Sequence, residues 1–315
     1  MPRVTLACLF PGQGAQSPGF LHRLPVHHAV RETLDEASAA LGFDVLTLDS
    51  ADALRSTVAV QIGLTVAGVA LARAFADEAL VPAFCAGLSV GAFAAAVCCG
   101  AVAFGDALRM VKKRAELMEA AYPSGFGLCA ISGLGETQIE TLAAAQTDSG
   151  GGRVYVANVN APRQIVVAGA YAALDAFTAH AHAAGARKVQ RLEVAIPSHC
   201  ELFDDEAGQL EAWSREIPFY APQGVYVDNR GGRPLHTGEE IRLDLAMNMR
   251  HTVRWFDALT VMVESGASVF VEAPPGQVLT DIAREYFPEA TALAASALPL
   301  ERLTAIVRRR IGDGD

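Results

Sequence analysis

The pentapeptide Gly87-Leu88-Ser89-Val90-Gly91 constrains the fold of this chain more than any other segment. The apolar tripeptide Phe84-Cys85-Ala86 before it predicts a buried strand, and the small residues at 92–97 after it predict a helix. In that context a G-x-S-x-G pattern is typical of a nucleophile elbow, a tight turn that presents a serine at the mouth of a parallel sheet. A side chain at either glycine would collide with the neighbouring strand or helix. An ordinary buried turn remains the alternative to a catalytic serine.

The backbone amides of this turn lead to a second expectation. The N–H groups of Ser89 and Val90 should lie at the N-terminus of the helix that starts after them. Unpaired amides at a helix N-terminus stabilise negative charge, because the helix dipole and the N–H groups both favour an anion. The sequence therefore predicts a serine with anion-stabilising donors beside it.

Composition limits the class of protein. The chain has 315 residues, of which 51% are hydrophobic and 19% charged, so one large or two modest domains with a sizeable core are expected. The net charge of −10 argues against nucleic acid and membrane surfaces as partners, since both require a basic face. Residues 84–104 carry no charge and are long enough to span a membrane, but they contain the elbow, so a buried strand-turn-helix is the better interpretation.

The six cysteines indicate the redox environment. Their spacing matches no zinc-binding pattern, and several lie in apolar runs, where cysteine behaves as a small hydrophobic residue. We therefore expect free thiols, no metal site and a reducing compartment, the cytoplasm. The residues are Cys8, Cys85, Cys98, Cys99, Cys129 and Cys200.

Two kinds of segment follow one another along the chain. Up to about residue 121, apolar runs typical of strands alternate with helix-length segments, which predicts an α/β fold with a parallel sheet. Residues 125–196 then read as strand, helix, strand, strand, helix, strand, the βαββαβ order of a ferredoxin-like unit. We expect this unit to be inserted into the first one, so that 1–124 and 197–315 together form the parallel-sheet core.

Three positions qualify as functional partners of Ser89. His199 lies at the junction between the insert and the core, where a cleft forms, and a serine needs a base to become a nucleophile. Gln13 follows the first strand, at the end where ligands bind in α/β sheets. Arg114 lies on a helix whose periodicity does not decide its role. Taken singly, each has an ordinary alternative: a structural histidine, a strand-to-helix turn and a solvated arginine.

Seven segments taken together resemble the malonyl-CoA:acyl-carrier-protein transacylases. They occur in the family's order and span residues 11–280, nearly the whole chain. The resemblance, and not composition or periodicity, supplies the expectations that follow from it. The segments are Pro11-Gly12-Gln13-Gly14, the elbow at Ser89, Arg114 with Met118, Asn158-Val159-Asn160-Ala161-Pro162, Ile196-Pro197-Ser198-His199-Cys200, Val253-Arg254-Trp255 and Pro275-Gly276-Gln277-Val278-Leu279-Thr280.

The resemblance implies an α/β-hydrolase-like core with a ferredoxin-like insertion, and a ping-pong reaction. By resemblance, Ser89 attacks the thioester of malonyl-CoA with His199 as general base. The amides of Gln13 and Val90 form the oxyanion hole, and Arg114 pairs with the malonyl carboxylate, which its planar fork fits bidentately. The malonyl ester on Ser89 then passes to the thiol of a small acyl carrier protein. No tightly bound cofactor is implied, and malonyl-CoA is the substrate.

Two residues differ from the family pattern, and they bear on which branch of the family the chain resembles. The family usually has histidine immediately before the nucleophile, where this chain has Leu88, and a glutamine that orients the base, where this chain has Asn248. We assign Leu88, Asn248 and Asn160 to base orientation or to the pocket. The form Gly-Leu-Ser-Val-Gly-Ala-Phe is more similar to the epsilon subunit of malonate decarboxylase, which loads a dedicated carrier subunit. That branch is our expectation, and the general transacylase of fatty-acid synthesis is the alternative.

Two further classes of function use parts of the same pattern. A serine esterase or thioesterase would have the same elbow but would need no Arg114. A non-catalytic scaffold for carrier docking would tolerate the loss of Ser89 and His199, and this chain has both.

Overall fold

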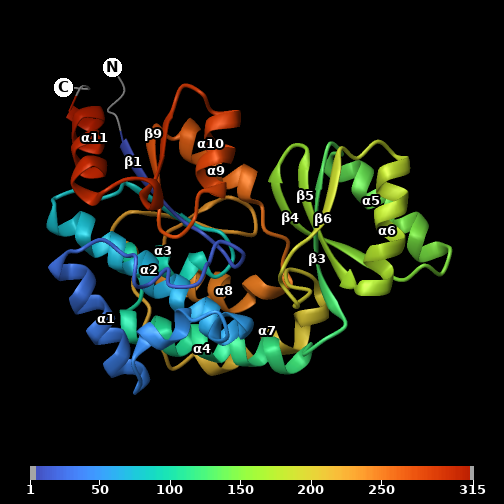
Figure 1. Ribbon diagram of the computed structural model, residues 1–315, viewed down its shortest axis with the longest axis horizontal. Helices are drawn as coiled ribbons and strands as arrows, with labels where there is room; N and C mark the ends of the chain where they lie inside the picture. Colours follow the sequence, from blue (N-terminus) through green and yellow to red (C-terminus); the bar gives the residue numbers. More distant parts are fainter. Residues whose placement is uncertain (1–4, 313–315) are drawn as a thin grey trace.

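The larger of two sheets places the carboxyl end of the first strand at the centre of the molecule (Figure 1). The computed structural model describes residues 5–312. The strand order is β10-β9-β1-β2-β7-β8, and neighbours are parallel except for the terminal pair β7-β8. The strands are β1 (Thr5–Phe10), β2 (Phe84–Gly87), β7 (Val225–Val227), β8 (Pro234–Leu235), β9 (Ala267–Glu272) and β10 (Thr291–Ala294).

Helices cover both faces of this sheet. Leu6, Cys8 and Phe10 of β1 belong to one apolar cluster, whereas Ala7 and Leu9 belong to the other. A parallel sheet buried on both faces needs apolar residues at every position, which explains the uninterrupted apolar run at the start of the chain. The first cluster includes residues of α1 (His28–Leu41), α2 (Thr57–Asp77), α3 (Gly91–Cys98), α4 (Phe104–Ala121), α7 (Asp204–Ser214), α8 (Gly238–Met247) and α11 (Leu300–Gly312), and the second those of α9 (Trp255–Glu264) and α10 (Val278–Tyr286).

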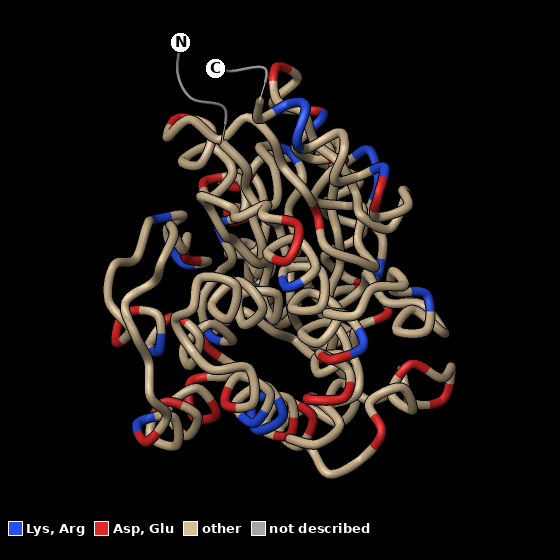
Figure 2. The backbone as a smooth tube through the Cα atoms, turned by 90° about the vertical axis from the view of Figure 1, so that its left-hand side faces the viewer, with Lys and Arg blue, Asp and Glu red and all other residues tan. Residues whose placement is uncertain are grey.

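Helix α2 is a buried helix that begins in an uncharged run, residues 56–72. Ser56 caps its N-terminus by accepting a hydrogen bond from the Val58 amide. By length and composition α2 resembles a membrane span, but 89% of its most apolar window is buried inside the protein. It packs against α1, α3 and α4, so its apolar surface belongs to the core. Figure 2 shows the charged residues mostly on the outer turns of the tube, around a centre with few charges.

The second sheet has four antiparallel strands in the order β4-β5-β3-β6. With α5 (Glu136–Asp148) and α6 (Tyr171–Ala183) packed on one face, it has the βαββαβ arrangement of a ferredoxin-like unit, as predicted (Figure 1). The strands are β3 (Phe126–Ser132), β4 (Val154–Ala161), β5 (Gln164–Ala170) and β6 (Lys188–Arg191). β6 ends at Arg191, and Leu192, Val194 and Ile196 after it line a cavity. We propose the boundaries 125–196 for this domain.

The two sheets are joined by backbone hydrogen bonds as well as by the chain itself. Val253 donates to the carbonyl of Ala157, and Val159 donates to the carbonyl of Val253, so β4 and the loop before α9 form a short parallel bridge. The other face of the second sheet contributes Leu128 and Val166 to the core cluster. This face lies opposite the carboxyl ends of β1 and β2, across the cavity.

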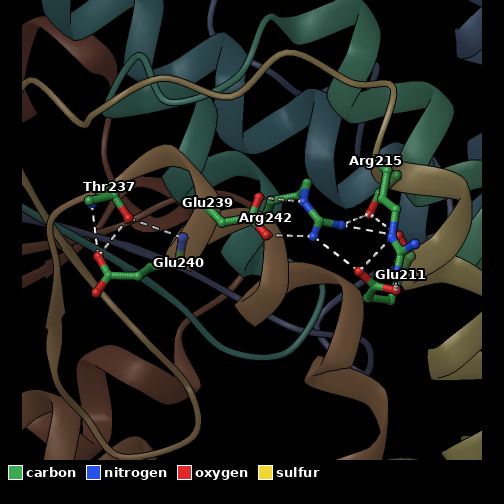
Figure 3. Close-up of polar contacts among 7 residues, drawn as sticks. Glu211, Arg215, Thr237, Glu239, Glu240 and Arg242 are labelled. Atoms are coloured by element: carbon green, nitrogen blue, oxygen red, sulfur yellow. Dashed lines mark hydrogen bonds and ion pairs between the residues drawn. The ribbon is translucent and has the colours of Figure 1, made fainter.

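An ion-pair network holds α7 against α8 (Figure 3). The Arg242 guanidinium is 5% exposed and lies 2.7 Å from Glu239 Oε1 and 3.1 Å from Glu211 Oε1. It also donates to Ser214 Oγ, at 2.8 Å. Thr237 and Glu240 form a capping box at the start of α8. The network fixes α8, which leads directly into the 3₁₀ turn η4 (Asn248–Arg250). The remaining 3₁₀ turns are η1 (Val45–Asp49), η2 (Ala53–Arg55), η3 (Glu201–Phe203) and η5 (Ala295–Ala297).

Candidate active site

Ser89 occupies a turn that two glycines make possible. Its φ of 55° lies in the left-handed region, which disfavours a residue with a Cβ. A Cβ at Gly87 would lie 2.0 Å from the backbone of Gly91, and a Cβ at Gly91 would lie 2.1 Å from the carbonyl oxygen of Phe10. The collisions predicted from the sequence are therefore confirmed. The glycines allow β1, β2 and α3 to approach closely at the turn that carries the serine.

His199 lies against the hydroxyl of Ser89. Its Nε2 is 2.7 Å from Ser89 Oγ, and its Nδ1 is 3.0 Å from the carbonyl oxygen of Asn248 and 3.2 Å from that of His251. Carbonyl oxygens only accept hydrogen bonds, so we assign the ring proton to Nδ1 and the lone pair to Nε2, toward the hydroxyl. Burial, and then the charge of Arg114, lower the pKa of His199 to about 3. The ring is neutral near pH 7 and can accept the serine proton.

Arg114 is a fully buried cation beside the nucleophile. It lies on the apolar face of α4, and its Nη2 is 3.1 Å from Ser89 Oγ. Its Nη1 donates to Gln61 Oε1 at 2.6 Å, and Nη2 lies 3.4 Å from Asn248 Oδ1. Burial lowers the pKa of Arg114 to about 9, and no carboxylate within residues 5–312 forms an ion pair with it. The guanidinium is a charge that lacks its counterion, which makes it a site for an anionic group.

The amide of Ser89 is not free, contrary to the sequence-based expectation. It donates to Oδ1 of Asn229 at 2.8 Å, and so it has no hydrogen left for an anion. In the part of the chain that the structure describes, the amides of Val90 and Gln13 have no hydrogen-bond partner. Both residues line the cavity at Ser89. The free donors therefore come from one residue after the nucleophile and one in the loop after β1.

A cavity of about 270 Å³ is lined by Ser89, His199, Gln13 and Val90, and Arg114 lies behind the Ser89 hydroxyl and Gln61. Its floor is polar, with Ser89, His199 and Gln61, and Glu272 lies at its edge. The opposite wall is apolar and comes from the second sheet and the chain that follows it. The apolar residues of that wall are Leu128, Ala130, Val166, Leu192, Val194 and Ile196.

Of the three remaining predicted residues, Leu88 and Asn160 line this cavity, and Asn248 lies behind it, against His199 and Arg114. Leu88 lines it and packs against Gly12, where a Cβ would be only 2.7 Å from Leu88 Cδ2. Asn160 lines it and is 8% exposed. Asn248 contacts the base through its backbone carbonyl, while its side-chain oxygen faces Arg114. The expected orientation of the base by the Asn248 side chain is therefore a contact made by the backbone.

Three further residues at or beside the site were not found from the sequence. Gln61 was detectable, since it is the single amide in the uncharged, buried run of α2. Glu272 was also detectable, because it ends an apolar strand. Its Oε2 accepts the Thr280 amide at 2.7 Å, and burial raises its pKa to about 7. Asn229 gives no signal in the sequence, because its contact joins residues 140 positions apart.

Within residues 5–312, one group of side chains brings three metal-ligand atoms within 4.8 Å of one another: His27, His28 and Asp77. None of the three lines the cavity. His27 Nδ1 accepts the amide of Ala29, so the proton of the neutral ring lies on Nε2, toward Asp77, where a metal would need a lone pair. The group therefore lies away from Ser89 and plays no part in its chemistry.

Comparison with known proteins places this geometry in a family. The family model described as "Acyl transferase domain" matches residues 8–305. The chain is similar to the malonyl CoA-acyl carrier protein transacylase of Escherichia coli K12, with 36% identity over 91% of this chain and 94% of that protein. It is also similar in structure to the malonyl CoA-acyl carrier protein transacylase of Coxiella burnetii, with a TM-score of 0.90, 31% identity and 98% of each chain covered.

A third similarity concerns a complex with a carrier. A malonyl-transacylase solved with its type II polyketide acyl-carrier protein has a TM-score of 0.85 and 32% identity, over 92% of this chain and 94% of that one.

Proposed function

This chain belongs to the acyl transferase domain family, and from that premise we propose that it moves a malonyl group from malonyl-CoA to an acyl carrier protein through Ser89. It is an acyltransferase, and its similar proteins are malonyl CoA-acyl carrier protein transacylases. The observation that carries the proposal is the buried Arg114 guanidinium, which has no carboxylate partner among residues 5–312 and lies 3.1 Å from the Ser89 hydroxyl.

In the first half-reaction, His199 Nε2 takes the hydroxyl proton of Ser89 as Oγ attacks the thioester carbon. The carbonyl oxygen becomes an oxyanion, and the amides of Gln13 and Val90 donate to it. When the C–S bond breaks, the imidazolium returns its proton to the leaving CoA sulfur. The malonyl group remains as an ester on Ser89.

The second half-reaction reverses these roles. His199 Nε2 takes the proton of the carrier thiol, and the thiolate attacks the malonyl ester. The tetrahedral intermediate again places its oxyanion at the two amides. Ser89 leaves with the proton from His199, and the carrier holds the malonyl group as a thioester. Side chains and amides of this chain supply each acid, base and donor in the proposed reaction.

Arg114 supplies selectivity in this proposal. Its fork can bind the malonyl carboxylate bidentately, while the acyl carbon lies at Ser89. An acetyl group would leave the buried cation without a partner, a penalty of about 1–3 kcal/mol or more. The same feature separates this function from that of an esterase, which would need no buried cation.

Intact-mass measurement after mixing with malonyl-CoA tests the proposal. The parent protein should gain one malonyl group, and Ser89→Ala should gain none. Acetyl-CoA should give little adduct under the same conditions. A malonyl adduct on Ser89→Ala would contradict the assignment of the nucleophile.

The acceptor is the finer part of the proposal. The transacylases reported above have carrier proteins in their names, and these names favour an acyl carrier protein over the carrier subunit of malonate decarboxylase. Leu88 is the residue that suggested the decarboxylase branch, and it lies in the cavity next to Gly12. A transfer assay with both carriers side by side decides between them. Faster transfer to the decarboxylase carrier would overturn the preference for acyl carrier protein.

We place this reaction in the cytoplasm. All six cysteines are free, and free thiols of this number fit a reducing compartment. Detection of the protein only in a membrane or extracellular fraction would contradict this assignment.

A further inference from the structure

We propose that Asn229 is a positioning residue that holds Ser89 in register with His199, an inference that rests on the proposed function of Ser89. Asn229 belongs to neither the motifs of the sequence nor the machinery described above. It follows β7 (Val225–Val227), the strand that pairs with β2 on the side away from β1. Only 5% of its surface is exposed.

The Asn229 side chain bridges the turn that carries the nucleophile. Its Oδ1 accepts the amide hydrogen of Ser89 at 2.8 Å, and its Nδ2 donates to the carbonyl of Gly87 at 2.7 Å. One partner only donates and the other only accepts, so the amide group has a single orientation that satisfies both. Among side chains of this length, only the amide offers both groups at neutral pH.

This bridge acts at a residue whose backbone conformation is disfavoured. Ser89 has a φ of 55°, and residues in the left-handed region with a Cβ persist only where their surroundings hold them. Asn229 contacts the Gly87 carbonyl and the Ser89 amide, which lie on either side of Leu88 in the chain. Without these two bonds, the amide of Ser89 and the carbonyl of Gly87 would be buried without partners.

The backbone of Asn229 reaches the other half of the catalytic pair. Its carbonyl oxygen accepts the amide of Arg254 at 2.7 Å. Arg254 ends the segment 248–254, and in that segment the carbonyls of Asn248 and His251 hold Nδ1 of His199. One residue therefore connects the turn of the nucleophile to the segment that orients the base, and the 2.7 Å contact between Ser89 and His199 lies between these two anchors.

The expected consequence is a loss of rate and not of binding. The bridge occupies the Ser89 amide, so it orients the elbow while the Val90 and Gln13 amides face the oxyanion. Arg114, which binds the carboxylate, is held by Gln61 and Asn248 in addition to its contact with Ser89 Oγ, and it does not contact Asn229. Removal of the bridge should therefore lower the rate constant of acylation and leave the KM for malonyl-CoA almost unchanged.

Single-turnover malonylation of Ser89 from malonyl-CoA, followed by intact mass, tests this inference. We expect Asn229→Ala to lower the acylation rate constant at least 30-fold, with KM within threefold of the parent value. Asn229→Asp keeps the shape but presents an ionised oxygen to the Gly87 carbonyl near pH 8, and we expect it to be as slow as Asn229→Ala. When protonated, the same side chain can donate to Gly87 and accept from Ser89, so its rate should recover at least tenfold as the pH falls to 5.5.

The parent protein is the reference for that pH profile. The charged groups near position 229 are Asp228, Arg230, Asp244 of α8 and Arg254. All four are present in both proteins, so the ratio of variant to parent rates reports the group at 229. A merely structural role would give a ratio that does not change with pH.

Two results would overturn the inference. One is an Asn229→Ala protein that acylates at the parent rate, and the other is an Asn229→Asp profile parallel to that of the parent. If Asn229→Ala does not fold, as judged by circular dichroism, the pH dependence of the ratio of the Asn229→Asp rate to the parent rate decides alone. Failure of the parent to acquire malonyl would instead reject the proposed function, so the two failures are distinguishable.

Discussion

Replacement of Arg114 by methionine should make the protein more stable and nearly inactive toward malonyl-CoA. Arg114 is fully buried, and its guanidinium has no carboxylate partner within residues 5–312. Methionine has a similar length and removes the charge. The substitution therefore separates the two consequences of one buried cation, its cost to folding and its value for substrate binding.

The pKa of Arg114 gives the size of the effect. Burial lowers it from 12.5 to about 9, and at about 1.36 kcal/mol per unit this corresponds to about 5 kcal/mol. The unfolded chain binds the proton more tightly, so stability rises with pH between about 9 and 12.5 and the full cost is present at pH 7. Loss of the partner of Gln61 Oε1 costs about 1–3 kcal/mol. The net gain for Arg114→Met is about 2–4 kcal/mol.

Thermal unfolding at pH 7 measures this gain. With an unfolding entropy of about 2.1 cal/mol/K per residue, a chain of 315 residues should melt about 3–6 °C higher. Free malonate should raise the melting temperature of the parent and not that of Arg114→Met. Formation of the malonyl adduct should fall by about 100-fold, the loss of one charged hydrogen-bonding partner.

A matched control is available on the same helix. Lys112 lies on the exposed side of α4, with 44% of its side chain accessible, and Lys112→Met should change the melting temperature by less than about 1 °C. A melting temperature for Arg114→Met equal to or below that of the parent would refute the reasoning, because it would mean that the buried charge is already compensated.

Three other substitutions test separate features. Gly91→Ala should lower the free energy of unfolding by about 3 kcal/mol or more in urea titrations, since its Cβ would lie 2.1 Å from the Phe10 carbonyl, and an unchanged midpoint would contradict the close approach. Burial raises the pKa of Glu272 to about 7, so its ionisation favours the unfolded chain and stability should fall as the pH rises from about 4.5 to 7. Melting curves from pH 5 to 8 should show a smaller fall for Glu272→Gln, and equal slopes would contradict the assignment. Arg242→Ala should lower the free energy of unfolding by about 2 kcal/mol, because it leaves Ser214 Oγ without its donor and removes the buried partner that Glu211 and Glu239 share, and calorimetry checks this.

The sequence determined the parts of the fold that have a long or strictly ordered pattern. The elbow was predictable because Gly87, Ser89 and Gly91 have a fixed spacing whose steric reason is local. The ferredoxin-like unit was predictable because its four strands and two helices follow one another without interruption in 126–191. Ser89, His199 and Arg114 meet in space as the resemblance implied, although each had an ordinary alternative when taken alone.

Other parts depend on contacts that no local pattern records. β7 has three residues and β10 has four, too short for an apolar period to identify them. Helices α1 and α10 were also not predicted. The side chain of Asn248 was expected to orient the base, but the length of asparagine places its oxygen at Arg114 and leaves the backbone carbonyl to hold His199. Asn229 acquires its role only when β7 pairs with β2.

The segment that forms the second sheet lies in the chain between β2 and β7 of the first sheet, and this has a consequence for the order of folding. All four strands of the second sheet come from one continuous segment, so their pairing closes short loops. β1 instead pairs on one side with β9, so that Thr5 lies opposite Ala267, and this contact requires nearly the whole chain. Until β9 arrives, β1 has an unpaired edge of apolar residues, a state prone to pair with other chains. The central strand of the catalytic sheet is thus completed late, followed only by the pairing of β9 with β10, and the inserted sheet is a folded neighbour against which it can assemble.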